Sequence, residues 1–432
     1  MKRLLTVVFA FFTLLAGRPA VAGVAIEHWQ TAGGTRVYFV ASRALPMLDV
    51  QVDFAAGSMF DPPGKSGLAA LTRGTLDLGA GDLDETAIAE QLADLGAQLG
   101  GGADTDRASV SLRTLTAPDK LAPALAILGR VLASPRFADE IFAREQTRTV
   151  SALKEAQTRP DSIAGKAFWE ALYPKHPYGR QASPESVAGL SRADARAFHA
   201  QYYVAANATI TLVGDLDRAS AERIAGELAA ALPTGSAAVL PAPPVAVKGS
   251  QKNIAHPASQ AHVQLGLPAI ERGHPDFFPL LVGNYTLGGG GFVSRLMKEV
   301  RDKRGYAYSV YSYFAPLKQP GPFQIGLQTK RSQARDAIKL ARSLLDDFVK
   351  HGPSTEELAA AKANLTGSFP LRLDSNRKLL DNAALIGFYG LPLDYLDTYQ
   401  ARVAAVTVDD VKKAFSRHIR SDLLTTVTVA GE

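Results

Sequence analysis

Two segments about 217 residues apart end in the same way, and this internal repeat is the strongest constraint on the fold. The sequence TITLVG ends at Gly214, and the sequence TVTVAG ends at Gly431. Phe198 and Phe415 each stand 16 residues before the closing glycine. Because one repeated pattern spans each half of the chain, we infer a duplicated domain.

Helix-start signals extend the repeat upstream of these strands. Ser191-x-x-Asp194 and Thr407-x-x-Asp410 are capping patterns at equivalent positions. Further upstream, the sequence RPDS at 159–162 corresponds to RLDS at 372–375 in the second half of the repeat. The two halves therefore share the order of their elements as well as their endings.

The periodicity predicts strands and helices in alternation within each half. Pairs of consecutive predicted strands separated by long helices favour an α+β fold, not a doubly wound parallel sheet. We expect two tandem homologous domains, each a mainly antiparallel sheet covered on one face by helices. The predicted strands are 35–41, 48–56, 107–115, 208–213, 261–267, 307–314 and 322–329. The predicted helices include 118–132, 138–157, 275–287, one from Gly288 to Asp302, and 332–351, with a helix capped by Asp84 and a glycine turn at 100–102.

Domain boundaries follow from composition. Residues 1–22 combine a basic start, an apolar stretch of 13 residues and the sequence AVA, which is typical of a cleaved signal peptide. The N-terminal domain then spans 23–232. Residues 233–250 are too rich in proline for a helix or a sheet interior, so we expect a linker there. The C-terminal domain spans 251–432.

Composition excludes several functions. Removal of residues 1–22 would lower the formal charge from +5 to +2, which gives no reason to expect a nucleic-acid partner. The chain has no cysteine, and therefore no disulfide, thiolate metal site or cysteine nucleophile. No segment beyond the signal is long and apolar enough to span a membrane. We expect an exported, periplasmic protein.

Residues 60–80 (FDPPGKSGLAALTRGTLDLGA) have the pattern of a metal-binding helix without metal ligands. Ser66 is placed to cap a helix that buries leucines 68, 71 and 76. Two histidines four residues apart with a glutamate between them would bind zinc and supply a base. This chain has Ala70, Arg73 and Gly74 at those positions. Alanine and glycine lack a donor atom, and an arginine charge repels a dication.

The spacing of the histidines along the chain does not indicate another zinc site that could replace this one. The eight histidines, at 28, 176, 199, 256, 262, 274, 351 and 418, include no pair three or four residues apart. We expect each to be solvated or locally hydrogen-bonded, and no metal bound by this chain.

The stretch PPGKSGLAALTRGTLDLGA resembles the region around the inverted zinc motif HxxEH of the pitrilysin and insulinase metallopeptidases, especially their bacterial branch related to mitochondrial processing peptidase. The resemblance covers the whole mature chain. It implies His, Glu and His at the positions of Ala70, Arg73 and Gly74, and a further glutamate ligand near Ser151 or Ala152. All four groups are missing.

The second half keeps more of the family pattern. EVRDKRGYAYSVYS, residues 299–312, resembles the family's C-terminal signature, in which an arginine and a tyrosine seven residues apart contact the substrate. Arg301 and Tyr308 match that spacing; Arg304, Tyr306 and Tyr311 are nearby alternatives. A guanidinium and a phenol are suited to bind a peptide carbonyl or an oxyanion.

Four glycines precede this signature. Gly288, Gly289, Gly290 and Gly291 do not form a phosphate-binding loop, because no Lys-Ser or Lys-Thr follows them. Close approach of the backbone to another segment explains them better. In the family this loop lies near the substrate chamber.

The resemblance implies a division of labour. We expect a zinc-less subunit that donates Arg301 and Tyr308 to a homologous HxxEH partner, in a heterodimer that degrades unfolded peptides. Zinc would belong to the partner. The alternative is a non-enzymatic peptide-binding or scaffold protein that could form a homodimer.

Overall fold

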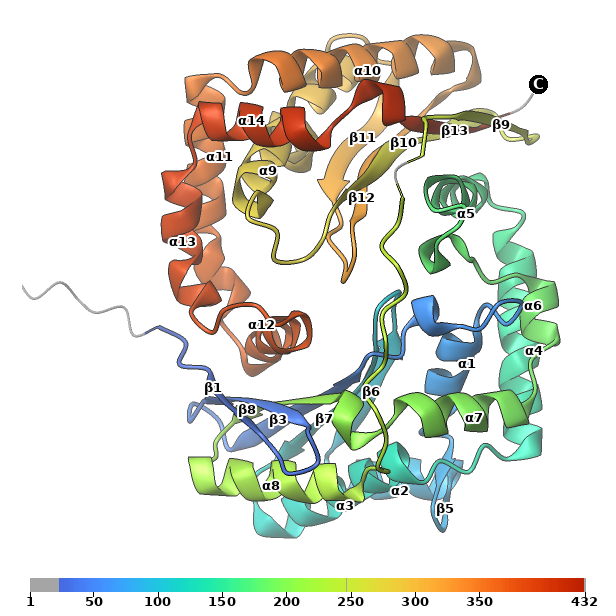
Figure 1. Cartoon of the computed structure of the whole chain (residues 1–432), viewed down its shortest axis with the longest axis vertical. Helices are drawn as coiled ribbons and strands as arrows, with labels where there is room; N and C mark the ends of the chain where they lie inside the picture. Colours follow the sequence, from blue (N-terminus) through green and yellow to red (C-terminus); the bar gives the residue numbers. More distant parts are fainter. Residues whose placement is uncertain (1–22, 246, 431–432) are drawn as a thin grey trace, which may run out of the picture.

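The computed structural model describes residues 23–430 except residue 246. Two mixed sheets, one from each half of the chain, lie in opposite halves of the molecule (Figure 1). The predicted signal peptide, residues 1–22, lies outside the described residues.

The N-terminal sheet has six strands in the order β1-β2-β8-β3-β7-β6. All neighbours are antiparallel except β2 and β8, which are parallel. A short hairpin, β4 (Gly79–Ala80) with β5 (Leu83–Asp84), lies outside it. The strands are β1 (Glu27–Gln30), β2 (Arg36–Ala41), β3 (Met47–Phe54), β6 (Gln98–Ala103), β7 (Ala108–Leu115) and β8 (Ala208–Gly214).

The C-terminal sheet repeats this arrangement with one strand fewer. Its order is β11-β12-β10-β13-β9, and its single parallel pair is β9 with β13. Strand β13 therefore takes the place of β8, and β11 takes the edge position of β6. This order confirms the predicted duplicated α+β fold. The strands are β9 (Gln251–Ala255), β10 (Gln260–Ile270), β11 (Ala307–Phe314), β12 (Gly321–Lys330) and β13 (Thr425–Ala430).

Helices pack on each sheet through apolar faces. The predicted caps form: Asp84 accepts the Ala87 amide at 2.8 Å, and Ser191 and Thr407 begin capping boxes. In the first half the helices are α1 (Leu68–Gly74), α2 (Glu85–Leu95), α3 (Pro118–Ala133), α4 (Asp139–Ala156), α5 (Pro160–Leu172), α6 (Pro184–Ala188), α7 (Arg192–Tyr202) and α8 (Arg218–Ala231). In the second half they are α9 (Phe277–Asn284), α10 (Ala334–His351), α11 (Thr355–Gly367), α12 (Asn376–Tyr389), α13 (Tyr395–Ala405) and α14 (Val408–His418).

Each half also places one helix on the sheet of the other half. Helix α12 packs on β2, β3 and β8, and helix α5 packs on β10 and β13 (Figure 1). Side chains of β2 alternate accordingly: Val37 and Phe39 belong to the N-terminal core, whereas Tyr38 packs in the second core with Ile386 of α12. Part of the second face of each sheet is therefore buried, which the predicted one-face arrangement lacked.

A buried carboxylate also joins the halves. Asp106 accepts hydrogen bonds of 2.8 Å from the hydroxyls of Tyr178 and Tyr389 and from the Lys318 amide. Lys318 and Tyr389 belong to the C-terminal half, so the contact crosses the domain boundary. Burial raises the pKa of Asp106, and these three donors oppose that rise.

Three local predictions are wrong. Ser66 does not cap α1, which begins at Leu68 after Gly67. Residues 100–102 form part of strand β6, not a turn. The expected helix from Gly288 to Asp302 is broken into π-helical segments, Tyr285–Gly289 and Met297–Asp302, with a 3-10 turn at Gly291–Val293 between them.

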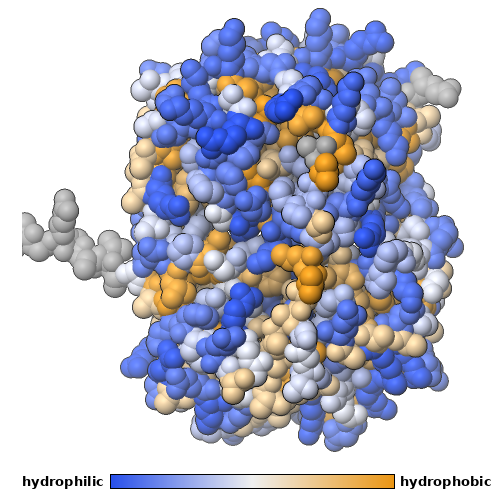
Figure 2. All heavy atoms as spheres, viewed as in Figure 1, coloured by the Kyte–Doolittle hydropathy of each residue, from blue (hydrophilic) through white to orange (hydrophobic). Residues whose placement is uncertain are grey.

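The surface viewed in Figure 2 is mostly hydrophilic, with apolar residues in separate patches. In the described part of the chain, no helix combines the length and apolar character needed to cross a bilayer.

Candidate functional site

Helix α1, which carries the altered zinc motif, is held at its start by a buried carboxylate. Asp61 accepts the amides of Gly67 and Ala69, each at 2.7 Å. These bonds satisfy donors that the first turn of a helix leaves unpaired. Burial raises the pKa of Asp61 to about 6, against the lowering effect of the same amides. Asp61 therefore has the capping role that the sequence suggests for Ser66.

The three motif positions divide between solvent and the protein interior. Ala70 and Gly74 are exposed, whereas Arg73 is 4% exposed. The Arg73 guanidinium donates to the carbonyl oxygens of Ser109 at 2.5 Å and Gly100 at 2.6 Å, on strands β7 and β6. Its side chain therefore anchors α1 to the edge of the sheet.

The expected position of the fourth ligand lies on a neighbouring helix. Ser151 is exposed on α4, and α4 contacts α1. A hydroxyl there and a buried guanidinium at Arg73 provide neither carboxylate nor imidazole. The residues at these four positions do not fit a catalytic zinc ion.

A second site lies in the C-terminal half, in a pocket of about 410 Å³. It is lined by Gly288, Gly289, Gly291, Phe292, Met297, Arg301 and residues 308–313. The glycine segment packs closely on β11, since a Cβ at Gly288 would lie 2.4 Å from the Ser312 hydroxyl oxygen. Asn284 secures the contact: its amide donates to the Ser312 carbonyl at 2.9 Å, and its own oxygen accepts from the Ser312 hydroxyl at 2.7 Å.

Arg301 lies between two exposed aromatic rings in this pocket. Its guanidinium carbon is 4.8 Å from the Phe292 ring centre and 5.4 Å from the Tyr308 ring centre. Among residues 23–430, residue 246 apart, no carboxylate oxygen lies within 4.0 Å of Arg301. Its N–H donors are thus available to a ligand.

Strand β11 forms a sheet edge beside the pocket, and on this edge the Ser312 carbonyl is already bonded by Asn284. It is the outermost strand of its sheet, and its pairing with β12 shifts register between Ala307 and Ser309. Tyr308 therefore lies in a β-bulge, where its side chain is 80% exposed. Tyr311 and Tyr313 stack at 6.0 Å on the same strand. An edge strand with exposed rings can bind an extended peptide.

The nearby residues that the sequence offers as alternatives differ in whether their side chains are free to bind a ligand. Arg304 is engaged by the Glu299 carboxylate at 2.8 Å, and Tyr306 is half-buried. The sequence argument missed Phe292 and Tyr313. An aromatic residue directly after four glycines is the signal that could have indicated Phe292.

Histidines form contacts that spacing along the sequence did not predict. His176 bonds the Gln319 side chain at 2.6 Å, and His418 bonds Asp276 at 2.8 Å. Both contacts join residues more than 140 positions apart. The expectation that every histidine is solvated or locally bonded is therefore wrong for these two, and also for His199 and His256, which bond the carbonyl oxygens of Leu132 and Thr158.

The fold and these sites define a two-domain metallopeptidase-like protein whose zinc motif has no ligands. Residues 39–184 match the family described as "Insulinase (Peptidase family M16)", and residues 189–365 match the one described as "Peptidase M16 inactive domain". The chain belongs to the M16 peptidase family.

Relatives and solved structures agree with this assignment. The chain is similar to the M16 inactive domain from Pseudomonas fluorescens, with 38% identity, a TM-score of 0.91 and coverage of 94% of this chain and 98% of that chain. It is similar to the "Non-peptidase homolog YmxG" of Helicobacter pylori, at 26% identity over 92% of each chain. It is also similar to the "Uncharacterized zinc protease YmxG" of Bacillus subtilis, at 23% identity over 83% of this chain and 87% of that protein. With Ala70, Arg73 and Gly74 in place of ligands, this chain is a non-catalytic M16-like protein.

Proposed function

We propose that this chain is the substrate-binding subunit of a heterodimeric zinc metalloendopeptidase that degrades unfolded peptides. Its own motif helix lacks the zinc ligands, so zinc, base and water belong to a homologous HxxEH partner. Arg301 and Tyr308 complete the partner's site. The observation that carries the proposal is the Arg301 guanidinium, which lies beside the rings of Phe292 and Tyr308 and has no carboxylate partner in the part of the chain that the structure describes.

The pocket chemistry supports a peptide main chain as ligand. A guanidinium donates to a carbonyl or to the oxyanion that develops on it, and the edge of β11 away from Ser312 supplies further backbone groups. Aromatic rings around the edge accept varied side chains. An extended, unfolded segment meets these requirements, whereas a folded surface would not reach the strand edge.

The test is reconstitution with an HxxEH-bearing chain that copurifies with this protein. We expect peptide cleavage only from the pair. An oxyanion donor is typically worth about 2.7–4 kcal/mol, so Arg301→Ala should reduce turnover by about 100-fold without preventing assembly.

Arg304→Ala is the matched control, because Arg304 lies three residues away but is paired with Glu299. Its turnover should stay near that of the wild type. Equal turnover of Arg301→Ala and wild type, or proteolysis by this chain alone, would contradict the proposal.

The alternative is a non-enzymatic scaffold or peptide-binding homodimer. The relative named a non-peptidase homolog supports it. Under this alternative the chain copurifies with its own copies, and peptides bind without being cleaved. Sedimentation of the native complex, with mass spectrometry of its subunits, separates a homodimer from a heterodimer.

We also propose export to the periplasm, on the basis of the pattern in residues 1–22. N-terminal sequencing of protein from the periplasmic fraction should give Gly23 as the first residue. A start at Met1 would contradict this.

A further inference from the structure

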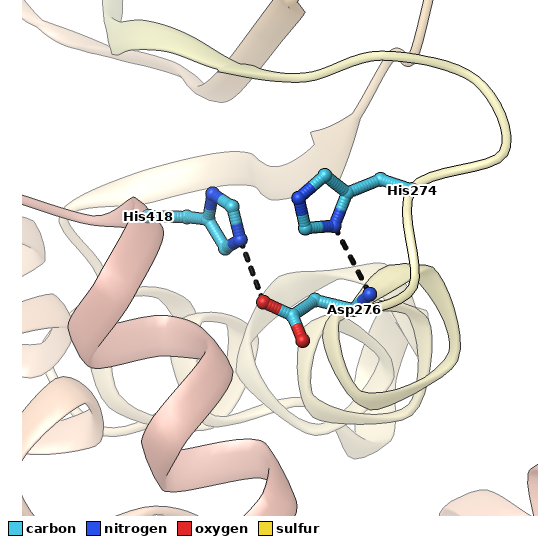
Figure 3. Close-up of side chains that lie close together, drawn as sticks. All are labelled: His274, Asp276 and His418. Carbon is cyan, nitrogen blue, oxygen red and sulfur yellow. Dashed lines mark hydrogen bonds and ion pairs between the residues drawn. The ribbon is translucent and has the colours of Figure 1, made fainter.

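Two histidines and an aspartate that are distant in the sequence meet where α9 begins and α14 ends. His274 precedes α9, Asp276 is its N-cap residue, and His418 is the last residue of α14 (Figure 3). One potential ligand atom from each residue lies within 4.8 Å of the other two. The two imidazole rings are 4.7 Å apart, nearly perpendicular. We propose that these three residues bind a divalent transition-metal ion of the zinc type.

Hydrogen bonds define which atoms are available. His274 Nδ1 accepts the Asp276 amide at 3.0 Å, so this nitrogen carries no proton; its single lone pair is directed at the amide, and an ion bound at Nδ1 would replace that hydrogen bond. His418 Nε2 lies 2.8 Å from Asp276 Oδ2 and donates to it. An ion would replace that shared proton, which moves to Nδ1 of the same ring.

The required movement is small for the His418–Asp276 pair, whereas the His274 nitrogen, within 4.8 Å of both, would move by up to about 1.5 Å. Two ligands at about 2.0–2.1 Å from a tetrahedral zinc ion lie about 3.3 Å apart. His418 Nε2 and Asp276 Oδ2 would therefore separate by about 0.5 Å from their present 2.8 Å. Two imidazoles with one carboxylate favour zinc over calcium or magnesium, which prefer oxygen ligands alone. Partial exposure of the cluster leaves a fourth position for water.

An ion-pair clamp is the competing explanation. Arg417 and His418 both bond Asp276 Oδ2, which by itself would fasten α14 to α9. That clamp accounts for Asp276, Arg417 and His418, whereas the second imidazole, His274, lies outside the clamp and accepts the Asp276 amide. The Arg417 charge opposes a dication and lowers its affinity. Arg417 therefore provides a variant for which the two explanations predict opposite effects.

The site is independent of the peptide pocket. Asp276 begins α9, and the pocket residue Gly288 lies 12 residues further along, roughly 18 Å for a helical rise. The ion would connect two helix ends, and we assign it no part in peptide cleavage.

The test is titration of the chelator-treated full chain with ZnCl2 in a calorimeter, with CaCl2 as the comparison. We expect one zinc ion per chain and no comparable calcium binding. Because each histidine supplies a direct ligand, His274→Ala and His418→Ala should each weaken zinc binding by about 100-fold or more. Arg417→Gln should strengthen it by about fivefold or more.

His351→Ala is the matched control. His351 bonds the Asp347 carboxylate at 2.8 Å, a histidine–aspartate pair outside the described three-residue cluster. Its loss should leave zinc binding unchanged. His274→Ala removes a half-exposed ring with one backbone hydrogen bond, so it should fold, as circular dichroism can verify.

Cobalt absorption provides a second measurement on the unmodified chain. Co2+ bound by two imidazoles and a carboxylate should give visible bands that one equivalent of zinc abolishes. Failure of the wild-type chain to bind one zinc ion would overturn the proposal. Zinc binding that His274→Ala leaves unchanged, or that Arg417→Gln weakens, would overturn it as well.

Discussion

The phenol of Tyr389 donates a 2.8 Å hydrogen bond to the carboxylate of Asp106, across the boundary between the two domains. Asp106 lies in the turn between β6 and β7, and Tyr389 ends α12, the helix that the C-terminal half places on the N-terminal sheet. One buried carboxylate thus joins the sheet edge of one domain to the exchanged helix of the other.

Asp106→Ala should destabilise the whole chain, because it leaves the buried Tyr178 phenol and the partly buried Tyr389 phenol and Lys318 amide without their acceptor. We expect a loss of about 3 kcal/mol or more in the free energy of unfolding by urea. Tyr389→Phe removes one donor and should cost about 1 kcal/mol. The exposed Asp119 is the control, and Asp119→Ala should change stability by less than about 0.5 kcal/mol. Equal effects of Asp106→Ala and Asp119→Ala would show that the contact does not hold the domains together.

Asp53 should make stability depend on pH. Burial raises its pKa to about 6, while Arg107 and the Gln51 amide oppose the rise. An unfolded aspartate titrates near pH 3.9, so the folded state binds the proton more tightly. Stability from this group is present below about pH 4 and is lost as pH rises through about 6.

The variant Asp53→Asn isolates this effect. Any stability that it loses through missing contacts is the same at every pH, so it does not alter how the difference in unfolding free energy changes with pH. The difference in unfolding free energy between wild type and variant should fall by roughly 2–3 kcal/mol from pH 4 to pH 7. Urea denaturation at four pH values between these limits measures it. A difference that stays constant would mean that Asp53 is already ionised in the fold at pH 4.

Tyr308 should affect binding but not stability, because its side chain is 80% exposed. Tyr308→Ala and Tyr308→Phe should both unfold within about 0.5 kcal/mol of the wild type. Phenylalanine keeps the ring beside Arg301, so only the alanine variant should release the guanidinium. If the hydroxyl contacts the substrate, both variants lose turnover in the reconstituted complex. If the ring only positions Arg301, Tyr308→Phe keeps it.

Local patterns in the sequence predicted the repeat and most elements. The capping boxes at Ser191 and Thr407 form as expected, and strand β11 spans the predicted residues. These features depend on residues close together in the chain, which is why periodicity and caps reveal them. Ser66 is the exception. Although serine is a good capping residue, the start of the helix is capped by the carboxylate of Asp61, which a turn brings back to the amides of Gly67 and Ala69.

Contacts between distant segments could not be predicted. The periodicity of α5 and α12 shows that one face is buried, but not that each covers the sheet of the other half. The sequence predicts a turn for Gly101, because a run of glycines is typical of turns. The structure gives it φ of 122° inside a strand, where a Cβ would lie 2.1 Å from the Ser109 oxygen and 2.8 Å from Arg73. The rings of His274 and His418 are in contact although the residues are 144 positions apart in the sequence, so no rule based on short spacings can predict this pair.

Restoring the zinc motif on α1 should fail. The triple variant Ala70→His, Arg73→Glu and Gly74→His supplies the family pattern, but position 73 faces the carbonyl oxygens of Ser109 and Gly100. A glutamate there meets acceptors only, so it should destabilise the fold by about 3 kcal/mol or raise its own pKa. Adding Ser151→Glu on the neighbouring α4 supplies a fourth group and should be needed for tight zinc binding. All these variants should carry His274→Ala, so that zinc bound beside α14 does not obscure the result. Calorimetric titration then compares the triple and quadruple variants, and tight binding by the triple variant alone would show that α4 does not provide the missing ligand.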